Sequence, residues 1–189
     1  MKPAVLCISA AVAASITSIG QIKEEDLHFL NRKTVDDKED ITIGALLPQV
    51  IPSIVIEVGG DRYLSYSRNG NETRLHGSRS ITVGGHIDIT DYEYTLRDTI
   101  ITAANRELCE EIGIKHYFEF QDFTHFIYLP VDDVSKVHFG LYTKLSLKDD
   151  SSCGLDEEIH DPKYLTKKQL IKDIDMYEPW SQHIILNIL

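Results

Sequence analysis

Apolar residues recur at three- and four-residue steps between positions 95 and 112, and this is the clearest periodic pattern in the chain. The apolar positions are Leu96, Ile100, Ala103, Ala104, Leu108 and Ile112. Gly113 follows directly, and glycine commonly ends a helix in a left-handed turn. The pattern therefore predicts an amphipathic helix over 95–112.

Shorter apolar runs on both sides of this helix predict strands. The runs 54–58 and 62–67 flank Gly59-Gly60-Asp61 and predict a β-hairpin. A further strand at about 80–83 would end at the pair Gly84-Gly85. After the helix we expect strands near 118–128 and 136–147, the second half-exposed because its apolar residues alternate. An acidic loop over 149–161 and helices over 166–174 and about 179–189 complete the prediction.

The N-terminal segment has two interpretations that stay open. Residues 4–8 read as a buried strand that leads into a small-residue helix from about Ser9. The basic Lys2 and the apolar run to Ile16 are also typical of a signal peptide. The polar segment 23–40 predicts a solvated helix and linker.

Strands before and after a central helix predict an α/β (α+β) fold without regular βαβ alternation. The length of 189 residues favours one domain with a small appendage. We expect residues 1–45 to form an N-terminal strand and helix extension packed on the core, and residues 46–189 to form the main domain.

Charge and cysteine content narrow the classes of function. Thirty Asp and Glu residues against nineteen Lys and Arg residues give a formal net charge of −11, which disfavours general nucleic-acid binding. Three cysteines lie far apart without a zinc-site spacing, which favours unpaired thiols in a reducing compartment. The apolar N-terminal run is too short for a comfortable membrane span. We therefore expect a cytoplasmic protein without a membrane segment.

Carboxylates crowd the end of the predicted helix. Glu110 and Glu111 lie three and four residues after Glu107, where like charges repel and the helix dipole disfavours anions. A hard divalent cation would reverse both effects, because Mg²⁺ prefers oxygen ligands. Arg106 precedes them, and Gly84-Gly85 offers bare backbone to a metal or phosphate.

The string Arg-Glu-Leu-Cys-Glu-Glu-Ile-Gly-Ile at 106–114 resembles the second half of the Nudix box of the MutT/Nudix hydrolases. Gly85 matches the leading glycine of the box, and Asp98 stands where the family has glutamate. Twelve residues separate these two positions where the family has five. We expect the resulting insertion, about 87–96, to form an exposed excursion. The resemblance covers roughly 50–175, and 74–88 is similar to a branch known as predicted MutT-family phosphoesterases.

The resemblance implies a Nudix-type αβα sandwich with a mixed central sheet. It also implies a metal-dependent pyrophosphohydrolase that cleaves nucleoside diphosphates linked to another moiety, with Mg²⁺ or Mn²⁺ as cofactor. Glu107, Glu110 and Glu111 would be the metal ligands, with the Gly85 carbonyl as a further one. Arg106 would orient the glutamates, and Asp98 would support them.

The remaining candidates rest on weaker signals, and each has an ordinary structural interpretation. The candidates for the general base that activates water are Glu158, Glu157 and His160, on the acidic loop. The substrate-side candidates are Gly84, Gly85, His86 and Arg74. Further phosphate contacts are Arg62, Arg68 and Arg79, and base-stacking candidates are Phe123, Tyr128 and Tyr142.

Two alternative functions remain within the same fold. One is a nucleotide sensor that binds without hydrolysis, although such modules usually lose glutamates of the box. The other is an isopentenyl-diphosphate-isomerase-like enzyme, disfavoured because we expect Cys109 to be packed inside the helix. The expected partner is a small-molecule nucleotide substrate, and a homodimer stays open.

Overall fold

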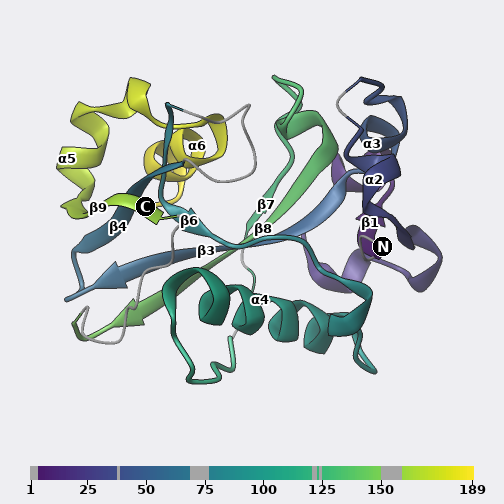
Figure 1. Ribbon diagram of the computed structural model, residues 1–189, viewed down its shortest axis with the longest axis horizontal. Helices are drawn as coiled ribbons and strands as arrows, with labels where there is room; N and C mark the ends of the chain where they lie inside the picture. The colour runs from purple at the N-terminus through teal and green to yellow at the C-terminus, as the bar shows by residue number, and fades with distance from the viewer. Residues whose placement is uncertain (1–3, 38, 69–76, 121–122, 124, 150–158) are drawn as a thin grey trace. The chain divides into compact units, whose positions relative to one another are not determined.

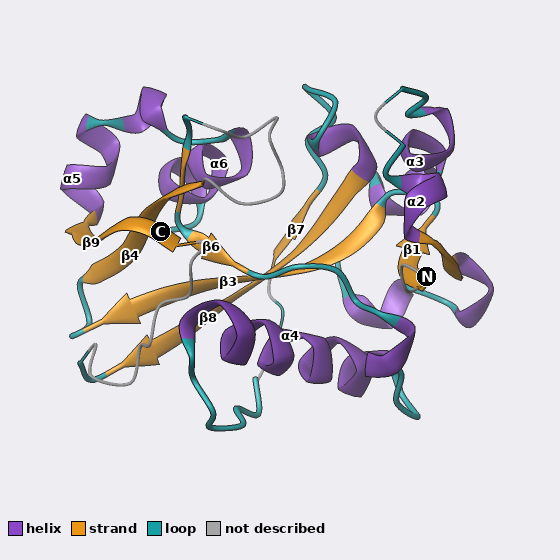
Figure 2. Ribbon diagram, in the orientation of Figure 1, coloured by secondary structure: helices purple, strands orange, loops and turns teal. Residues whose placement is uncertain are grey.

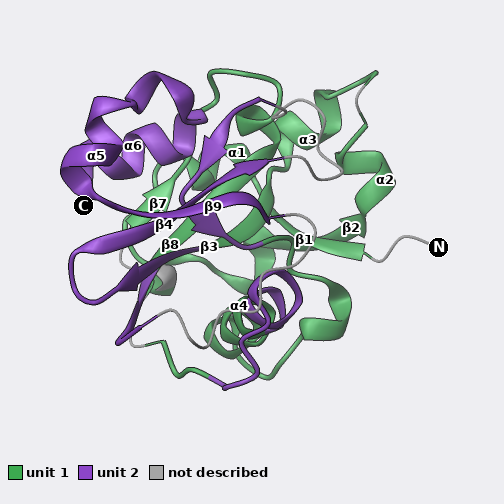
Figure 3. Ribbon diagram, turned by 60° about the vertical axis from the view of Figure 1, so that its left-hand side comes forward, with its two compact units in different colours: residues 1–53, 85–105, 118–143 green, residues 54–84, 106–117, 144–189 purple. Residues whose placement is uncertain are grey.

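The computed structural model describes residues 4–37, 39–68, 77–120, 123, 125–149 and 159–189. The chain divides into two compact units (Figure 3). Unit 1 comprises 1–53, 85–105 and 118–143, and unit 2 comprises 54–84, 106–117 and 144–189. Strands β3 and β8 and helix α4 each run from one unit into the other.

Strands and helices alternate irregularly along the described parts of the chain (Figure 2). The strands are β1 (Ala4–Ile8), β2 (Leu27–Asn31), β3 (Gln49–Val58), β4 (Arg62–Arg68), β5 (Arg79–Ser80), β6 (Thr82–Val83), β7 (His125–Ile127), β8 (His138–Leu147) and β9 (Ile159–Thr166). The α-helices are α1 (Ala10–Ala13), α2 (Arg32–Val35), α3 (Thr42–Leu46), α4 (Leu96–Ile112), α5 (Lys167–Lys172) and α6 (Pro179–Asn187). The short 3₁₀ turns are η1 (Ile19–Gln21), η2 (Glu24–Asp26), η4 (Ile89–Asp91), η5 (Ser135–Val137) and η6 (Ile174–Met176). No helix within the described ranges is long and apolar enough to cross a membrane.

In unit 1, β1 pairs antiparallel with β2 along its whole length and meets the start of β3 at Cys7. The strand predicted at 4–8 is thus confirmed, and Ser9 caps the short α1 that follows. Val5, Cys7 and Val35 are fully buried and form a small core.

The segment 23–40 does not form the solvated helix and linker that its polarity predicts. It contains η2, strand β2 and the single turn α2. Each residue of β2 pairs with a residue of β1, and Leu30 packs on the core formed by Val5, Cys7 and Val35. Hydrogen bonding to a distant strand outweighs the local charge pattern here.

The insertion 87–96 is exposed over most of its length, as expected, but it is anchored at the buried Ile87 and Asp91. Ile87 is fully buried, and its carbonyl accepts a hydrogen bond of 2.9 Å from the Leu6 N–H. The Asp91 carboxylate accepts a hydrogen bond of 2.8 Å from the Asp88 N–H, which closes turn η4. Tyr92 and Tyr94 are 62% and 98% exposed. Ile87 is therefore part of the unit 1 core, whereas Ile89 and Thr90 after it are exposed.

Strands β7 and β8 pair antiparallel, with His125 opposite Tyr142. β7 begins at His125, later than the expected 118, and Phe118 to Phe120 are not strand. The expected half-exposed pattern of β8 is wrong over its first half, where Phe139, Leu141 and also Tyr142 are buried. Residues on both faces of that half are covered, as in central strands.

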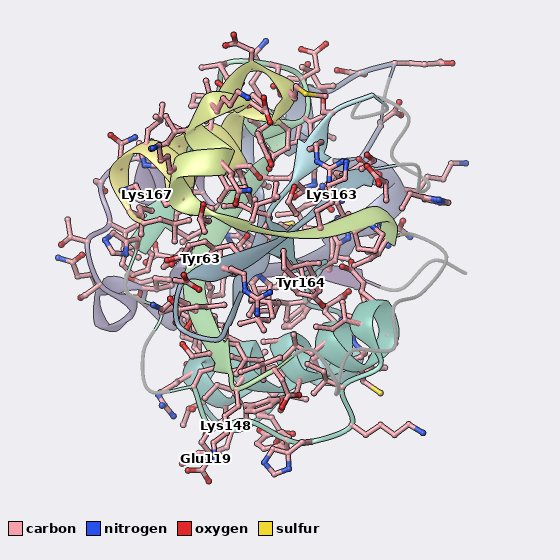
Figure 4. All side chains as sticks on the ribbon, turned by 90° about the vertical axis from the view of Figure 1, so that its left-hand side faces the viewer. Tyr63, Glu119, Lys148, Lys163, Tyr164 and Lys167 are labelled. Atoms are coloured by element: carbon pink, nitrogen blue, oxygen red, sulfur yellow. The ribbon has the colours of Figure 1, made fainter. Side chains whose placement is uncertain are left out.

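In unit 2, the predicted hairpin of β3 and β4 is confirmed, with Val58 opposite Arg62. β4 also pairs with β5 and β9, and β3 with β6. Figure 4 shows Tyr63 on β4 and Lys163 and Tyr164 on the neighbouring β9. Strand β9 replaces the end of the expected loop from Ile159 on; the rest of that loop, 150–158, lies outside the described residues.

Helices α5 and α6 lie beside β4 and β9 in Figure 1. Both begin near the predicted positions, with Thr166 and Glu178 as N-caps. Their buried residues Leu170, Ile184 and Ile185 contribute to the core of unit 2.

Helix α4 is confirmed at nearly its predicted length. At its end Gly113 adopts φ 66°, a left-handed conformation that glycine accepts without a steric penalty. The Ile114 N–H then donates a hydrogen bond of 3.2 Å to the Leu108 carbonyl. The helix therefore ends at Ile112, one residue after its last carboxylate.

Candidate active site

The last turns of α4 bring Arg106, Glu107 and Glu110 together. Arg106 Nη1 lies 2.6 Å from Glu107 Oε1 and 3.1 Å from Glu110 Oε2. Glu107 is only 8% exposed, whereas the Glu110 side chain is 60% exposed. Burying a carboxylate is costly unless it is paired, and the Arg106 guanidinium supplies that pairing. The Arg106 guanidinium thus holds the carboxylates of Glu107 and Glu110 in fixed orientation.

Cys109 lies on the same turn and is exposed. The expectation that it packs inside the helix is wrong, because the buried side of the helix passes through Leu108 and Glu107. Burial of Cys109 therefore gives no argument against an isomerase.

Glu111 is partly buried, and its negative charge acts on the buried phenol of Tyr66 on β4. Burial raises the pKa of Tyr66, the negative charges of Glu111 and Glu178 raise it further, and the Arg68 guanidinium lowers it. The ionisation of Tyr66 is therefore coupled to the charges of Arg68, Glu111 and Glu178.

The Tyr66 hydroxyl donates a hydrogen bond of 2.6 Å to the carbonyl of Thr82 on β6. β6 leads directly into Gly84, which adopts φ 148°. Side chains rarely accept this conformation, so the glycine is required for the backbone path at this position. Tyr66 therefore links the surroundings of Glu111 to the strand that precedes the glycine pair.

Glu178 is a buried carboxylate that the sequence analysis did not single out. Its carboxylate caps α6 by accepting hydrogen bonds from the Trp180 and Ser181 N–H groups and from the Ser181 hydroxyl. Burial raises the pKa of Glu178, which these hydrogen bonds and the Arg68 charge oppose. The Ser181 hydroxyl oxygen accepts the Ile81 N–H at 3.0 Å, so α6 also holds the segment between β5 and β6. The available signal was Glu178 directly before Pro179, a common helix start.

Arg79 is not available as a phosphate contact. It is 6% exposed, and its guanidinium donates to the side chains of Ser65, Ser67 and Asp161 and to the carbonyls of Ser65 and Asp161. Its distance to the Asp161 carboxylate is 2.8 Å. Arg79 is a structural link between β5, β4 and β9.

The other predicted residues have varied positions. Arg74, Glu157 and Glu158 lie outside the described residues. His160 and Arg62 are exposed on strands, and Phe123 and Tyr142 are buried. Tyr128 is partly buried.

Gly85, His86 and Asp98 belong to unit 1, whereas Gly84 and the three box glutamates belong to unit 2. His86 is partly buried, with its ring centroid 5.7 Å from that of His138. Asp98 is exposed and its carboxylate accepts a hydrogen bond of 2.7 Å from the Thr95 hydroxyl at the start of α4. The Thr95 hydroxyl oxygen in turn accepts the Asp98 N–H at 3.1 Å, so Thr95 caps the helix start and Asp98 orients its hydroxyl.

The donor chemistry of the glutamates fits a hard divalent cation. Three carboxylates lie within one and a half turns of helix, and carboxylate oxygens are the ligands that Mg²⁺ and Mn²⁺ prefer. Among the residues that the structure describes, no group of three or more His, Cys, Asp or Glu side chains is gathered as metal ligands. Arg106 instead supplies the positive charge between Glu107 and Glu110.

No protein-family model matches the chain. The chain is similar to Protein YmaB of Bacillus subtilis (strain 168), with 30% identity over 147 residues that cover 72% of this chain and 69% of YmaB. It resembles in structure Tm1382, a candidate Nudix hydrolase, with a TM-score of 0.71 and 22% identity, covering 98% of this chain and 100% of that chain. It also resembles a Nudix hydrolase from Nitrosomonas europaea, with a TM-score of 0.50 and 22% identity, covering 73% of this chain and 86% of that one.

These similarities agree with the box at 106–114. The fold shared with Tm1382 confirms the predicted α/β class. Together with the relationship to YmaB, they show that the chain belongs to the MutT/Nudix hydrolase family.

Proposed function

We propose that this protein is a pyrophosphohydrolase that uses Mg²⁺ or Mn²⁺ to cleave a phosphoanhydride bond in a nucleoside diphosphate derivative. Glu107, Glu110 and Glu111 would hold the cation, together with the Gly85 carbonyl. Arg106 would orient Glu107 and Glu110 for that task. A bound cation would neutralise the charge of the phosphates, which otherwise repel an attacking water.

The observation that carries this proposal is the nearly buried carboxylate of Glu107, held with Glu110 by one guanidinium at the end of α4. A helix end disfavours negative charge, so three glutamates at this position cost stability. Such a cost is typical of a functional site, where binding of a cation offsets it.

The proposed reaction transfers one water molecule across a P–O–P bridge. The water oxygen forms a bond to one phosphorus, the bridging oxygen leaves with the other phosphate, and the water protons pass to the base and the products. Glu158 is our candidate base, on the segment outside the described residues. Gly84, His86 and Arg74 are proposed substrate contacts.

The proposed substrate is a small-molecule nucleotide, and the net charge of −11 supports this over a nucleic acid. A cytoplasmic location and a homodimeric assembly remain proposals. The reducing compartment is supported by the exposed thiol of Cys109, which is unpaired in the structure.

The test is a phosphate-release screen with Mg²⁺ or Mn²⁺ over dinucleoside polyphosphates, nucleotide sugars, nucleoside triphosphates and capped RNA. Isopentenyl diphosphate is included to detect isomerisation. For the best substrate, Glu111→Gln is expected to lower kcat about 100-fold or more, because it removes a preorganised electrostatic contact. The matched control is Glu119→Gln, an exposed glutamate outside the box (Figure 4), which leaves kcat unchanged.

Equal turnover by Glu111→Gln and the parent contradicts a role of this carboxylate in hydrolysis. Nucleotide binding without phosphate release from any substrate supports the sensor alternative instead.

A further inference from the structure

Unit 1 contains a pocket of about 210 Å³ that none of the predicted hydrolytic residues lines. Its walls come from β1, from the N-terminal segment 22–29 and from the box insertion with the start of α4. The volume equals that of about seven liquid water molecules at about 30 Å³ each. The pocket therefore has room for a small organic molecule.

Aromatic rings form much of the wall. The rings of Phe29 and Tyr92 meet edge to face, with centroids 5.9 Å apart and planes at 79°. This contact holds Tyr92 against β2, yet Tyr92 is still 62% exposed. Tyr94 also lines the pocket and is 98% exposed. The Tyr92 ring is thus held in place by Phe29, while Tyr92 and Tyr94 remain accessible to solvent.

Two carboxylates, Glu24 and Glu93, lie among the lining residues. The lining contains no lysine, arginine or histidine in the part of the chain that the structure describes. The neighbouring cations have other partners: Lys23 pairs with Glu25 at 3.6 Å, and Arg97 donates to the Phe120 carbonyl at 2.6 Å. The pocket therefore combines aromatic rings with two negative charges that no basic lining residue compensates.

We propose that this pocket binds an organic cation, an ammonium or guanidinium group carried on an aromatic or alkyl body. The apolar body would pack on Phe29, Tyr92 and the buried Leu6, and the cation would lie between the ring faces and the two carboxylates. Aromatic faces attract cations through the ring quadrupole, and the carboxylates add a Coulomb attraction. The same charges repel a phosphate, so a nucleotide is a poor occupant.

This inference does not depend on the proposed hydrolysis. Residues 22–29 and 92–96 carry none of the box glutamates, and 87–96 lies outside the spacing of the box pattern. These two segments, 22–29 and 92–96, form most of the pocket wall, together with Leu6 and Thr99.

The test measures binding of phenethylammonium to the whole protein by ligand titration in NMR, without metal or nucleotide. Its neutral analogue 2-phenylethanol serves as the matched ligand. We expect phenethylammonium to shift the ring signals of Phe29 and Tyr92 and to bind at least about fivefold more tightly than 2-phenylethanol.

The double substitution Glu24→Gln and Glu93→Gln is expected to weaken phenethylammonium about fivefold or more and to leave 2-phenylethanol unchanged. The control pair Glu39→Gln and Glu119→Gln removes the same charge from exposed sites outside the pocket, and affinity stays at the parent value. Equal affinity for the two ligands, no binding of phenethylammonium, or an undiminished affinity in the Glu24/Glu93 variant would overturn the proposal.

Discussion

At the scale of single residues, Arg106 forms ion pairs with two glutamates that differ in burial. Its guanidinium compensates the buried charge of Glu107 and restrains the exposed Glu110. A surface ion pair contributes little to stability, so the contact to Glu107 is the one that matters energetically. The negative charge of Glu111 acts on a different group, the buried phenol of Tyr66, whose pKa it raises.

Tyr66→Phe is expected to lower the free energy of unfolding by about 0.5 to 1.5 kcal/mol, because it removes the hydrogen bond to the Thr82 carbonyl and leaves that carbonyl only the longer hydrogen bond of 3.3 Å from the Ser80 hydroxyl. Urea denaturation followed by circular dichroism measures the change. Tyr117→Phe is the control, since Tyr117 is 56% exposed, and it should change stability by less than about 0.5 kcal/mol. Identical urea midpoints for Tyr66→Phe and the parent would show that the hydroxyl does not support β6.

The segment between Gly85 and α4 shows how an element can differ from its sequence pattern. Its isolated bridge from Asp88 to Val5 joins it to β1, and the Thr99 hydroxyl accepts the Glu93 N–H at 2.9 Å. The insertion is therefore anchored at both ends. Its exposed tyrosines, Tyr92 and Tyr94, lie on either side of the second anchor at Glu93.

Ile87→Ala and Tyr94→Ala compare a buried and an exposed residue of the insertion 87–96. Ile87→Ala is expected to cost about 2 to 5 kcal/mol, because it leaves a cavity in the core of unit 1. Tyr94→Ala removes a side chain that is 98% exposed and should cost less than about 0.5 kcal/mol. Thermal unfolding of both variants gives the comparison, and equal losses would mean that the insertion is not anchored through Ile87.

At the scale of the whole molecule, an excess of eleven negative charges opposes compaction. The box glutamates add a local concentration of that charge at one helix end. A divalent cation that binds only the folded chain stabilises it by linkage, by about 2.7 kcal/mol at a concentration one hundred times its Kd.

Mg²⁺ or Mn²⁺ is therefore expected to raise the melting temperature of the protein. The variant with both Glu110→Gln and Glu111→Gln should melt at or above the parent temperature without metal, because like-charge repulsion is relieved. Added metal should then stabilise it much less than the parent. Differential scanning fluorimetry over a metal titration measures both effects, and equal metal stabilisation of the two proteins would rule out the glutamates as ligands.

Local patterns were sufficient for α4, the β3–β4 hairpin and the starts of α5 and α6. In each case the signal lies within a few residues: apolar spacing, a Gly-Gly turn, or a capping residue such as Thr166. The candidate glutamates were found the same way, because helix geometry alone places positions 107, 110 and 111 within two turns.

Only the tertiary structure decided the features that depend on distant partners. β2 forms because it pairs with β1 along its whole length. The Ile87 carbonyl accepts the N–H of Leu6 on the same strand β1, and this contact anchors the buried Ile87. Arg79 reads as an ordinary surface charge until the chain brings Asp161 to it, and the Ser181 hydroxyl has its distant partner only because α6 meets the Ile81 N–H. Burial and pairing arise between residues up to about a hundred positions apart, and a local pattern carries no information about such contacts.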